Sequence, residues 1–432
     1  MSAGGKSFWT VALDLLRQGP FRRYIIGSAI SDTGTWMQVM AQGWVMSSLT
    51  NHALVLALVN FAAGIPTLAL TMIGGSLADR HDKRLILIAT QVVQIATAAV
   101  VGLLVMTGSI QIWHVAVIAA VLGTCIAFEM PAISALVPEL VKKDQIAAAI
   151  AMDRSVFHGA RLVGPFLAGL FVAWWGAASA FFCNAFTFTA LIIALVSLPP
   201  RPKGTAEEEE QRRSGFKEGL RYVRSDRTIL AMIALIGLTT IFVFPVVSVM
   251  LPLYVRNILH LGPDRLGMLM GISAIGSLSG AIGLLSVARE LRLKFMTIAA
   301  VLVAIALFFL SRSNSFLLTA CCMGILAIGL SLNFGLAGTI VQERSPGPLR
   351  GRISAIFGLS FFGLMPITGF LVTGLSDWIG MRTAIAIAAV LFGIGAVLVL
   401  TAAGRTVCEC PETPVPEDEA ATTDEPAPAS VV

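Results

Sequence analysis

Three charged side chains lie deep inside long apolar stretches of this 432-residue sequence: Asp32, Glu129 and Arg161. An ionisable group in apolar surroundings is costly, so it is a candidate functional residue wherever it occurs. A lone carboxylate in such a place can load and release a proton, and Asp32 has this character. The alternative is that Asp32 faces a water-filled cavity and has no role in coupling.

Glu129 and Arg161 fall at comparable depths in two consecutive apolar stretches, which suggests an ion pair between them. Arg154, His158 and Arg161 are spaced i, i+4 and i+7, so they share one helix face and lead from the pair toward the cytoplasmic end. The pair could equally be structural. We expect His158 and His114 to serve packing rather than proton transfer.

Composition indicates that the elements holding these side chains are membrane-spanning helices. Hydrophobic residues make up 56% of the chain and charged residues 13%, and the mean hydropathy is +0.84. A soluble domain has roughly 25% charged residues, so this chain has too little polar surface to face water. Soluble enzymes, secreted domains and disordered proteins are therefore excluded. The net charge of +5 is small for the length, which argues against a nucleic-acid binder.

Twelve apolar stretches are each long enough to cross a bilayer as a helix, which takes about 20 residues. They occupy residues 24–47, 53–77, 85–106, 111–137, 148–175, 179–198, 228–254, 266–288, 293–311, 315–341, 352–376 and 383–403. Their length and their lack of alternation argue against a β-barrel. The expected fold is an all-α membrane protein with twelve transmembrane helices in two pseudo-symmetric six-helix bundles.

Arg and Lys residues are distributed unevenly over the segments that connect these stretches. They number 24 on one side of the membrane and 4 on the other, and two lie within a stretch. Because basic residues stay on the cytoplasmic side, we expect both termini in the cytoplasm. The N-terminal 20 residues lack the pattern of a cleavable signal peptide.

A weak internal repeat supports the division into halves. The runs 173–180 and 377–384 share Trp, Gly and Ala at matching positions, with an offset of about 204 residues. We therefore expect an N-terminal bundle (1–198), a cytoplasmic linker (199–227), a C-terminal bundle (228–404) and a disordered tail (405–432). The linker is predicted to end in an amphipathic helix, since Phe216, Leu220 and Val223 recur at helical spacing. The tail is rich in Pro, Ala and acidic residues.

The loop between the second and third stretches combines glycine, an acid and bases at a distinctive spacing. It contains Gly75, Asp79, Arg80, Lys83 and Arg84. Glycine permits close helix approach, and the Asp79 carboxylate can meet the positive end of another helix. The bases alone would also serve as anchors on the cytoplasmic side.

This run resembles the loop signature of the major facilitator superfamily. Two positions depart from that pattern: Asp82 stands where the family has glycine, and Lys83 replaces the first of a basic pair. The resemblance implies the major facilitator fold and a cytoplasmic gate, in which Asp79 closes against the eleventh helix.

Further motifs resemble the enterobactin-exporter-like branch of that superfamily, also described as transmembrane secretion effectors. The likeness covers nearly the whole first half, including the runs 31–50 and 131–141. The fifth stretch carries Gly159, Gly164, Pro165 and Gly169, which resemble the motif of proton-linked antiporters in that helix. Small residues at this spacing also allow tight helix crossing, so ordinary packing is the alternative.

Polar and aromatic residues within the stretches are candidates for lining a central cavity. These are Trp36, Gln38, Gln42, Asn60, His158, Asn333 and Phe334. Such a lining suits bulky amphipathic solutes. The sequence shows no phosphate-binding loop, Ser-His-Asp set, paired metal ligands or cofactor fingerprint. We therefore expect no enzymatic activity, no metal and no cofactor, with an ion gradient as the energy source.

The resemblance and the intramembrane charges lead to one expected function. The chain is predicted to be a monomeric secondary transporter of the bacterial inner membrane. It would exchange protons for a small amphipathic molecule, a siderophore or a drug, and so export that molecule. Two alternatives stay open: uptake or uncoupled facilitation of a nutrient on the same fold, and a non-transporting receptor or scaffold. The expected partners are the solute, protons and the lipid bilayer, without nucleic acid.

Overall fold

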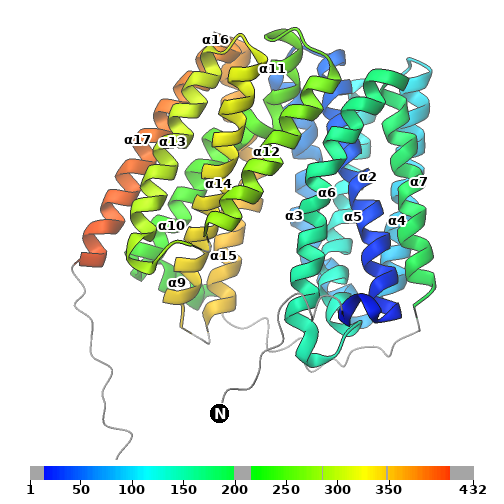
Figure 1. The fold of residues 1–432 in the computed structure, drawn as a ribbon, viewed down its shortest axis with the longest axis horizontal. Coiled ribbons are helices and arrows are strands. Elements are labelled where there is room, and N and C mark those ends of the chain that lie inside the picture. Colours follow the sequence, from blue (N-terminus) through cyan, green and yellow to red (C-terminus); the bar gives the residue numbers. More distant parts are fainter. Residues whose placement is uncertain (1–13, 199–215, 285, 347–348, 409–432) are drawn as a thin grey trace, which may run out of the picture.

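Inside a bilayer, a single apolar stretch satisfies its backbone hydrogen bonds by forming a helix. The computed structural model describes residues 14–198, 216–284, 286–346 and 349–408. In those ranges the chain forms long helices joined by short turns, without a strand. Figure 1 shows two groups of helices side by side, one from each half of the sequence. The predicted all-α fold with two six-helix bundles is confirmed.

The first bundle consists of six long helices. They are α2 (Gly19–Leu49), α3 (Ala53–Arg80), α4 (Lys83–Met106), α5 (Ile112–Glu139), α6 (Ile146–Trp175) and α7 (Ala177–Val196), with the 3-10 turn η1 (Lys143–Gln145) before α6. Short turns suffice because each helix runs antiparallel to the next. Asp82 begins α4, since its carboxylate accepts a hydrogen bond from the backbone N–H of Arg84 at 3.0 Å.

The second bundle has six spanning segments, of which two are interrupted. The seventh segment comprises α10 (Arg227–Leu238), two π-helical turns, η2 (Thr239–Val243) and η3 (Val246–Met250), and α11 (Leu251–Asn257). The eleventh comprises α15 (Arg350–Phe362) and α16 (Met365–Ile379), separated by a turn. The other elements are α12 (Pro263–Leu284), η4 (Arg289–Leu291), α13 (Arg292–Arg312), α14 (Phe316–Arg344) and α17 (Met381–Cys408).

Eleven of the described spanning segments are both long enough and apolar enough to cross a membrane. The twelfth, α2, is 31 residues long but is interrupted by polar side chains such as Asp32, Gln38 and Gln42. Its neighbours α6 and α7 cover it on two sides. A helix packed in this way needs less apolar surface than one facing lipid on most of its circumference.

The internal repeat is visible in the backbone. Gly176 ends α6 with φ +81°, and Gly380 ends α16 with φ +89°. This left-handed conformation favours glycine, so the matching glycines of the repeat have the same structural task. The predicted offset of about 204 residues therefore relates two equivalent helix ends.

The helix predicted at the end of the linker exists as α9 (Phe216–Ser225). It packs against α10 and α15; Val223 is buried, and the Tyr222 hydroxyl donates a hydrogen bond to the carbonyl oxygen of Arg344 at 3.2 Å. The last helix, α17, continues to Cys408, past residue 405 where we expect the tail to begin. The remainder of both segments, 199–215 and 409–432, lies outside the described residues.

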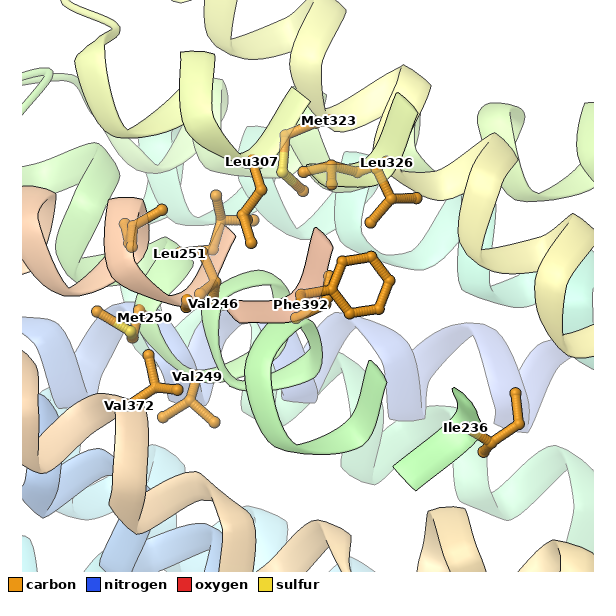
Figure 2. Close-up of a cluster of buried hydrophobic side chains, with 14 of the residues drawn as sticks. Ile236, Val246, Val249, Met250, Leu251, Leu307, Met323, Leu326, Val372 and Phe392 are labelled. Carbon is orange, nitrogen blue, oxygen red and sulfur yellow. The ribbon is translucent and has the colours of Figure 1, made fainter. Parts of the chain in front are cut away.

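The largest buried hydrophobic cluster has most of its members in the second bundle (Figure 2). The side chains labelled there come from the seventh segment and from α13, α14, α16 and α17: Ile236, Val246, Val249, Met250, Leu251, Leu307, Met323, Leu326, Val372 and Phe392. The seventh segment thus lies at the centre of its bundle.

The two bundles meet mainly through two equivalent helix pairs, α6 with α12 and α3 with α16, and α11 adds a smaller contact with α2. Glycine brings the first pair together, since a Cβ on Gly267 would lie 2.5 Å from the carbonyl oxygen of Pro165. Pro366 of α16 packs on Gly64 of α3 in the second pair. These contacts lie toward the end of the molecule where α11 and the α16 terminus are found, the upper end in Figure 1. We call this the opposite end, and the end with α9 and the α3–α4 turn the basic end.

Two adjacent glycines of α3 differ in their surroundings. A Cβ on Gly74 would clash with the carbonyl oxygen of Ala127 in α5, whereas a Cβ on Gly75 would meet nothing within 4 Å. The prediction that Gly75 permits close helix approach is therefore wrong for this conformation. Its neighbour Gly74 has that role, because one residue turns a helix by about 100°.

This difference predicts the stability of two adjacent variants. Gly74→Ala should lower the free energy of unfolding by about 1–3 kcal/mol, because backbone atoms of α5 cannot yield to the added methyl group. Gly75→Ala should leave it unchanged or raise it by about 0.5–1 kcal/mol, the usual preference of a helix for alanine. Thermal unfolding of the detergent-solubilised chain measures both. Equal losses in the two variants would contradict the assignment.

Candidate functional site

A buried polar cluster connects α2 and α6 around Asp32. The Asp32 carboxylate accepts a hydrogen bond from the Ser28 hydroxyl at 3.1 Å, one turn away on α2. Nearby, the Tyr24 hydroxyl donates to the Asp153 carboxylate of α6 at 2.9 Å, and both side chains are buried. In the described part of the chain Asp32 has no ion pair with a basic side chain. Its charge is therefore balanced by no fixed cation.

Glu129 of α5 is held by amides rather than by a cation. Its two carboxylate oxygens accept hydrogen bonds from Gln91 at 2.7 Å and Gln94 at 2.8 Å, both on α4. Gln91 in turn accepts one from the Ser31 hydroxyl of α2 at 3.3 Å, so these bonds link α2, α4 and α5. The predicted Glu129–Arg161 ion pair is wrong: neither residue has an ion pair within the described ranges.

Arg161 lies over an aromatic ring. Its guanidinium carbon is 5.2 Å from the ring centroid of Trp36 on α2, a cation–π geometry. Phe157, one turn earlier on α6, packs edge-on against the same indole at 5.8 Å. The Trp36 Nε1–H is buried and has no acceptor within the part of the chain that the structure describes.

Asp153 and Tyr24 are functional candidates that the sequence-based reasoning missed. Asp153 is a carboxylate within the fifth apolar stretch, which could have singled it out. Its neighbour Arg154 obscures this signal, since adjacent opposite charges in a sequence resemble an ion pair. The structure places Asp153 on the buried side of α6 and leaves Arg154 exposed.

Two of the basic residues predicted to form the gate, Lys83 and Arg84, are bound within the first bundle. Lys83 forms an ion pair with Glu139 at the end of α5, with N and O 2.7 Å apart. Arg84 donates to the Asp82 carboxylate and to the carbonyl oxygen of Leu198. These bonds from Arg84 hold the pKa of the Asp82 carboxyl below its usual range. They fix the α3–α4 turn against α5 and α7.

Asp79 is exposed at the basic end and does not close against the eleventh helix in this conformation. The inner part of that helix, α15, packs instead against α9, α10 and α14 of its own bundle. The expected gate contact is therefore absent here. The physical reason is that the bundles touch at the opposite end, which separates them at the basic end.

A carboxylate does close the same two helices at the opposite end. Asp377, in the last turn of α16, accepts hydrogen bonds from the backbone N–H groups of Ala53 at 2.8 Å and Leu54 at 3.0 Å. These are orphan donors at the start of α3, where the helix dipole is positive. His52 Nδ1 lies 3.7 Å from the same carboxylate. This contact could not be predicted from the sequence, because an acid at a helix end resembles any surface charge.

The glycines of the fifth helix divide into two groups. A Cβ on Gly164 would lie 2.6 Å from the Trp36 Cβ, and one on Gly169 would lie 3.0 Å from the carbonyl oxygen of Pro263. Gly159 faces open space. Close packing through Gly164 and Gly169 is therefore observed, with Pro165 buried between them. The antiporter interpretation of this motif remains a prediction.

The predicted cavity residues are only partly brought together. Phe334 lines a cavity of about 380 Å³ between α14 and α15, with Phe357 among its other walls. Gln38 is buried and accepts a hydrogen bond from the Asn184 amide at 2.7 Å, so its assignment to a cavity is wrong. Asn60 is exposed and donates to the carbonyl oxygen of Leu56. Asn333 is buried, and neither polar atom of its amide has a partner among the described residues. Gln42 is half-buried.

Comparison with known proteins places the chain among membrane transporters. A family described as transmembrane secretion effectors matches residues 10–425. Macrolide efflux protein A of Streptococcus pyogenes is 23% identical over 368 residues, which cover 82% of this chain and 89% of that protein. Multidrug efflux pump Tap of Mycolicibacterium fortuitum is 24% identical over 394 residues, which cover 88% and 96%.

Solved structures share the fold at low identity. A bacterial homologue of the human lysosomal transporter Spinster superposes with a TM-score of 0.70 at 13% identity, covering 90% of this chain and 97% of that one. A bacterial homologue of the iron transporter ferroportin superposes with a TM-score of 0.64 at 17% identity, covering 90% and 99%. These likenesses identify the major facilitator fold.

The Asp377 contact predicts a change in access at the opposite end. Asp377→Ala removes two acceptors and a negative charge from the start of α3, a loss of about 1 kcal/mol, so openings there should become several-fold more frequent. The reporter is Ala57→Cys, at a buried position of α3 that faces Gly369 of α16, in a chain without other cysteines. The rate of thiol labelling should rise several-fold.

The matched control is Asp264→Ala, which removes a partly exposed acid at the same end. Asp264 pairs with Arg265 at 3.4 Å on the surface, and such pairs contribute little. Its labelling rate should stay at the reporter's own value. An Asp377→Ala rate equal to the control would show that the capping contact does not hold this end closed.

Proposed function

The chain belongs to the transmembrane secretion effector family of the major facilitator superfamily, and on this basis we propose that it is a proton-coupled exporter of small amphipathic molecules. It is a multi-pass membrane transporter rather than an enzyme. Its relatives are named for efflux of macrolides and of multiple drugs, which favours drugs over siderophores as solutes. The proposed location is the bacterial inner membrane, with both termini in the cytoplasm and the monomer as the working unit.

The observation that carries the proposal is the environment of Asp32. This carboxylate lies within the first bundle with one hydroxyl donor, while Asp153 has the Tyr24 hydroxyl and Glu129 has two amides. Asp32 is also only partly buried, whereas Asp153 is buried. Among the three acids, Asp32 is therefore the one that can exchange a proton with water while its neighbours stay hydrogen-bonded.

Alternating access supplies the transport step. The bundles touch through α6 with α12 and α3 with α16 toward the opposite end, while Met72, Asp79 and Leu359 are exposed at the basic end, where the solute and protons would enter. If the basic end is cytoplasmic, as the distribution of Arg and Lys indicates, this is the conformation that takes up solute from the cytoplasm. The reverse conformation would need closure of α15 against α3, and the turn between α15 and α16 allows α15 to move.

The proton-coupling role of Asp32 predicts a specific loss. Asp32→Asn should abolish solute efflux driven by a pH gradient, because the amide cannot carry a proton, while the melting temperature stays close to that of the unmodified chain. Efflux is measured in proteoliposomes with three amphipathic probes: rhodamine 123 (cationic), Nile red (neutral) and 2-naphthoate (anionic).

Asp144→Asn is the control, since Asp144 is exposed in the turn η1. Unchanged efflux in Asp32→Asn would remove Asp32 from the mechanism. Net accumulation of a probe in the compartment from which export should remove it would instead identify an uptake system.

The gate role of Asp79 predicts a change in closure at the basic end. Asp79→Asn should reduce the fraction of molecules in which α15 approaches α3 by a few-fold, because the amide loses its charge attraction to the start of α15. The distance between spin labels at Met72→Cys and Leu359→Cys, both exposed here, measures this fraction. An identical distance distribution with and without the substitution would exclude the gate.

A further inference from the structure

The charged stripe on α6 has no assigned task in this mechanism. Arg154, His158 and Arg161 are all exposed, and they lie along one face of the helix. Gly164 marks the face of α6 that touches α2, and Gly169 marks the face that touches α12. At about 100° per residue, the stripe falls between these two faces. It therefore borders the space between the two bundles, on the side of the basic end.

Arg161 stands at the closed end of that space. It is one turn from Pro165, whose carbonyl oxygen is in contact with the backbone of Gly267 in the other bundle. Between this contact and the basic end, the next side chains of the stripe are His158 and Arg154. A solute that entered from the basic end would thus meet Arg161 last, where the bundles come together.

Two hydrogen-bond donors at this position lack acceptors. Arg161 has no carboxylate within 4.0 Å in the described ranges, and its one recorded partner is the Trp36 ring. The Trp36 Nε1–H is buried without an acceptor. A buried donor without a partner is unfavourable, and the exposed guanidinium of Arg161 has several donors to offer, so both groups favour a ligand that brings acceptor oxygens.

The local charge has the same sign along the whole stripe. The acid nearest in sequence, Asp153, faces away from the stripe and is bound to Tyr24. Glu129 is bound to the two amides of α4. A guanidinium presents its donors in a planar fork that matches a carboxylate, so an anion is favoured here and a cation is not.

The aromatic rings define the rest of the ligand. Trp36 and Phe157 pack edge-to-face, with their centroids 5.8 Å apart, directly beside the guanidinium. Rings in this arrangement accept a further flat apolar surface. We propose that Arg161 and Trp36 form a subsite for the carboxylate of an aromatic amphiphile. This inference rests on the proposed export function and names a solute class for it.

The test compares two flat probes that differ in one group, 2-naphthoate and 2-naphthamide. Equilibrium dialysis against the full-length chain in detergent measures the affinity of each. The carboxylate should bind about tenfold more tightly, since bonds to a charged group are the stronger ones. Arg161→Gln should remove this preference and leave the amide's affinity unchanged, whereas Arg161→Lys should keep part of it.

Two further variants test two separate points. The first asks whether the Trp36 N–H contributes beyond its ring, and the second asks whether loss of any cation–π pair has the same effect. Trp36→Phe keeps a ring but loses the N–H, so it should weaken 2-naphthoate binding alone. Arg265 lies over Phe316 at 5.1 Å, away from the space between the bundles, and Arg265→Gln should leave both affinities unchanged. Equal affinity of the two probes for the unmodified chain would overturn the proposal. So would an equal loss for both probes in Arg161→Gln, which indicates a structural role.

The failure of this inference and that of the export function are distinguishable. Binding is measured without a gradient, so a tenfold preference that disappears in Arg161→Gln supports the subsite even if no probe is pumped. Efflux of all three amphipathic probes without a binding preference would support export and reject the subsite.

Discussion

The contact of glycine backbones between α6 and α12 is the constraint on which the other features depend. Gly267 of α12 packs on the backbone of Pro165 and Gly169 in α6, because neither glycine has a side chain to hold the helices apart. This contact brings the bundles together at one end and leaves Asp79 exposed at the other. It also sets the depth of Arg161, one turn away on α6. A bulkier residue at either glycine would change the access route and the solute site together.

Three acids inside the spanning helices of the first bundle have neutral hydrogen-bond donors rather than cations as partners. Glu129 takes two amides, Asp153 a phenol and Asp32 a hydroxyl. A neutral donor offers a carboxylate a hydrogen bond without adding a compensating charge, which is the environment that the proposed role of Asp32 requires. A guanidinium partner would have held Glu129 ionised. The same arrangement leaves Arg161 available to the space between the bundles.

Sequence alone was sufficient for the helices and the repeat, because composition and periodicity reflect the solvent each residue faces. The partners of individual side chains could not be predicted in this way. Whether Glu129 meets Arg161 or Gln91 depends on how α5 is rotated against α4 and α6, and no periodicity records that rotation. Gly74 and Gly75 show the same limit, since they are adjacent in sequence and face different surroundings. The contact of Asp377 could not be predicted either, because its partners are backbone N–H groups, which nearly every residue has.

The repeat makes the two contacts between the bundles equivalent in position but not in chemistry. Asp377 corresponds to Ala173 under the offset of the repeat, so a carboxylate fastens α3 to α16 while α6 and α12 meet through bare backbone. The contact of α3 with α16 depends on the side chain of Asp377, whereas the backbone contact of α6 with α12 depends on the absence of a side chain. The two contacts of a symmetric fold therefore respond to opposite changes: truncation of one side chain weakens the first, and only the addition of a side chain disrupts the second.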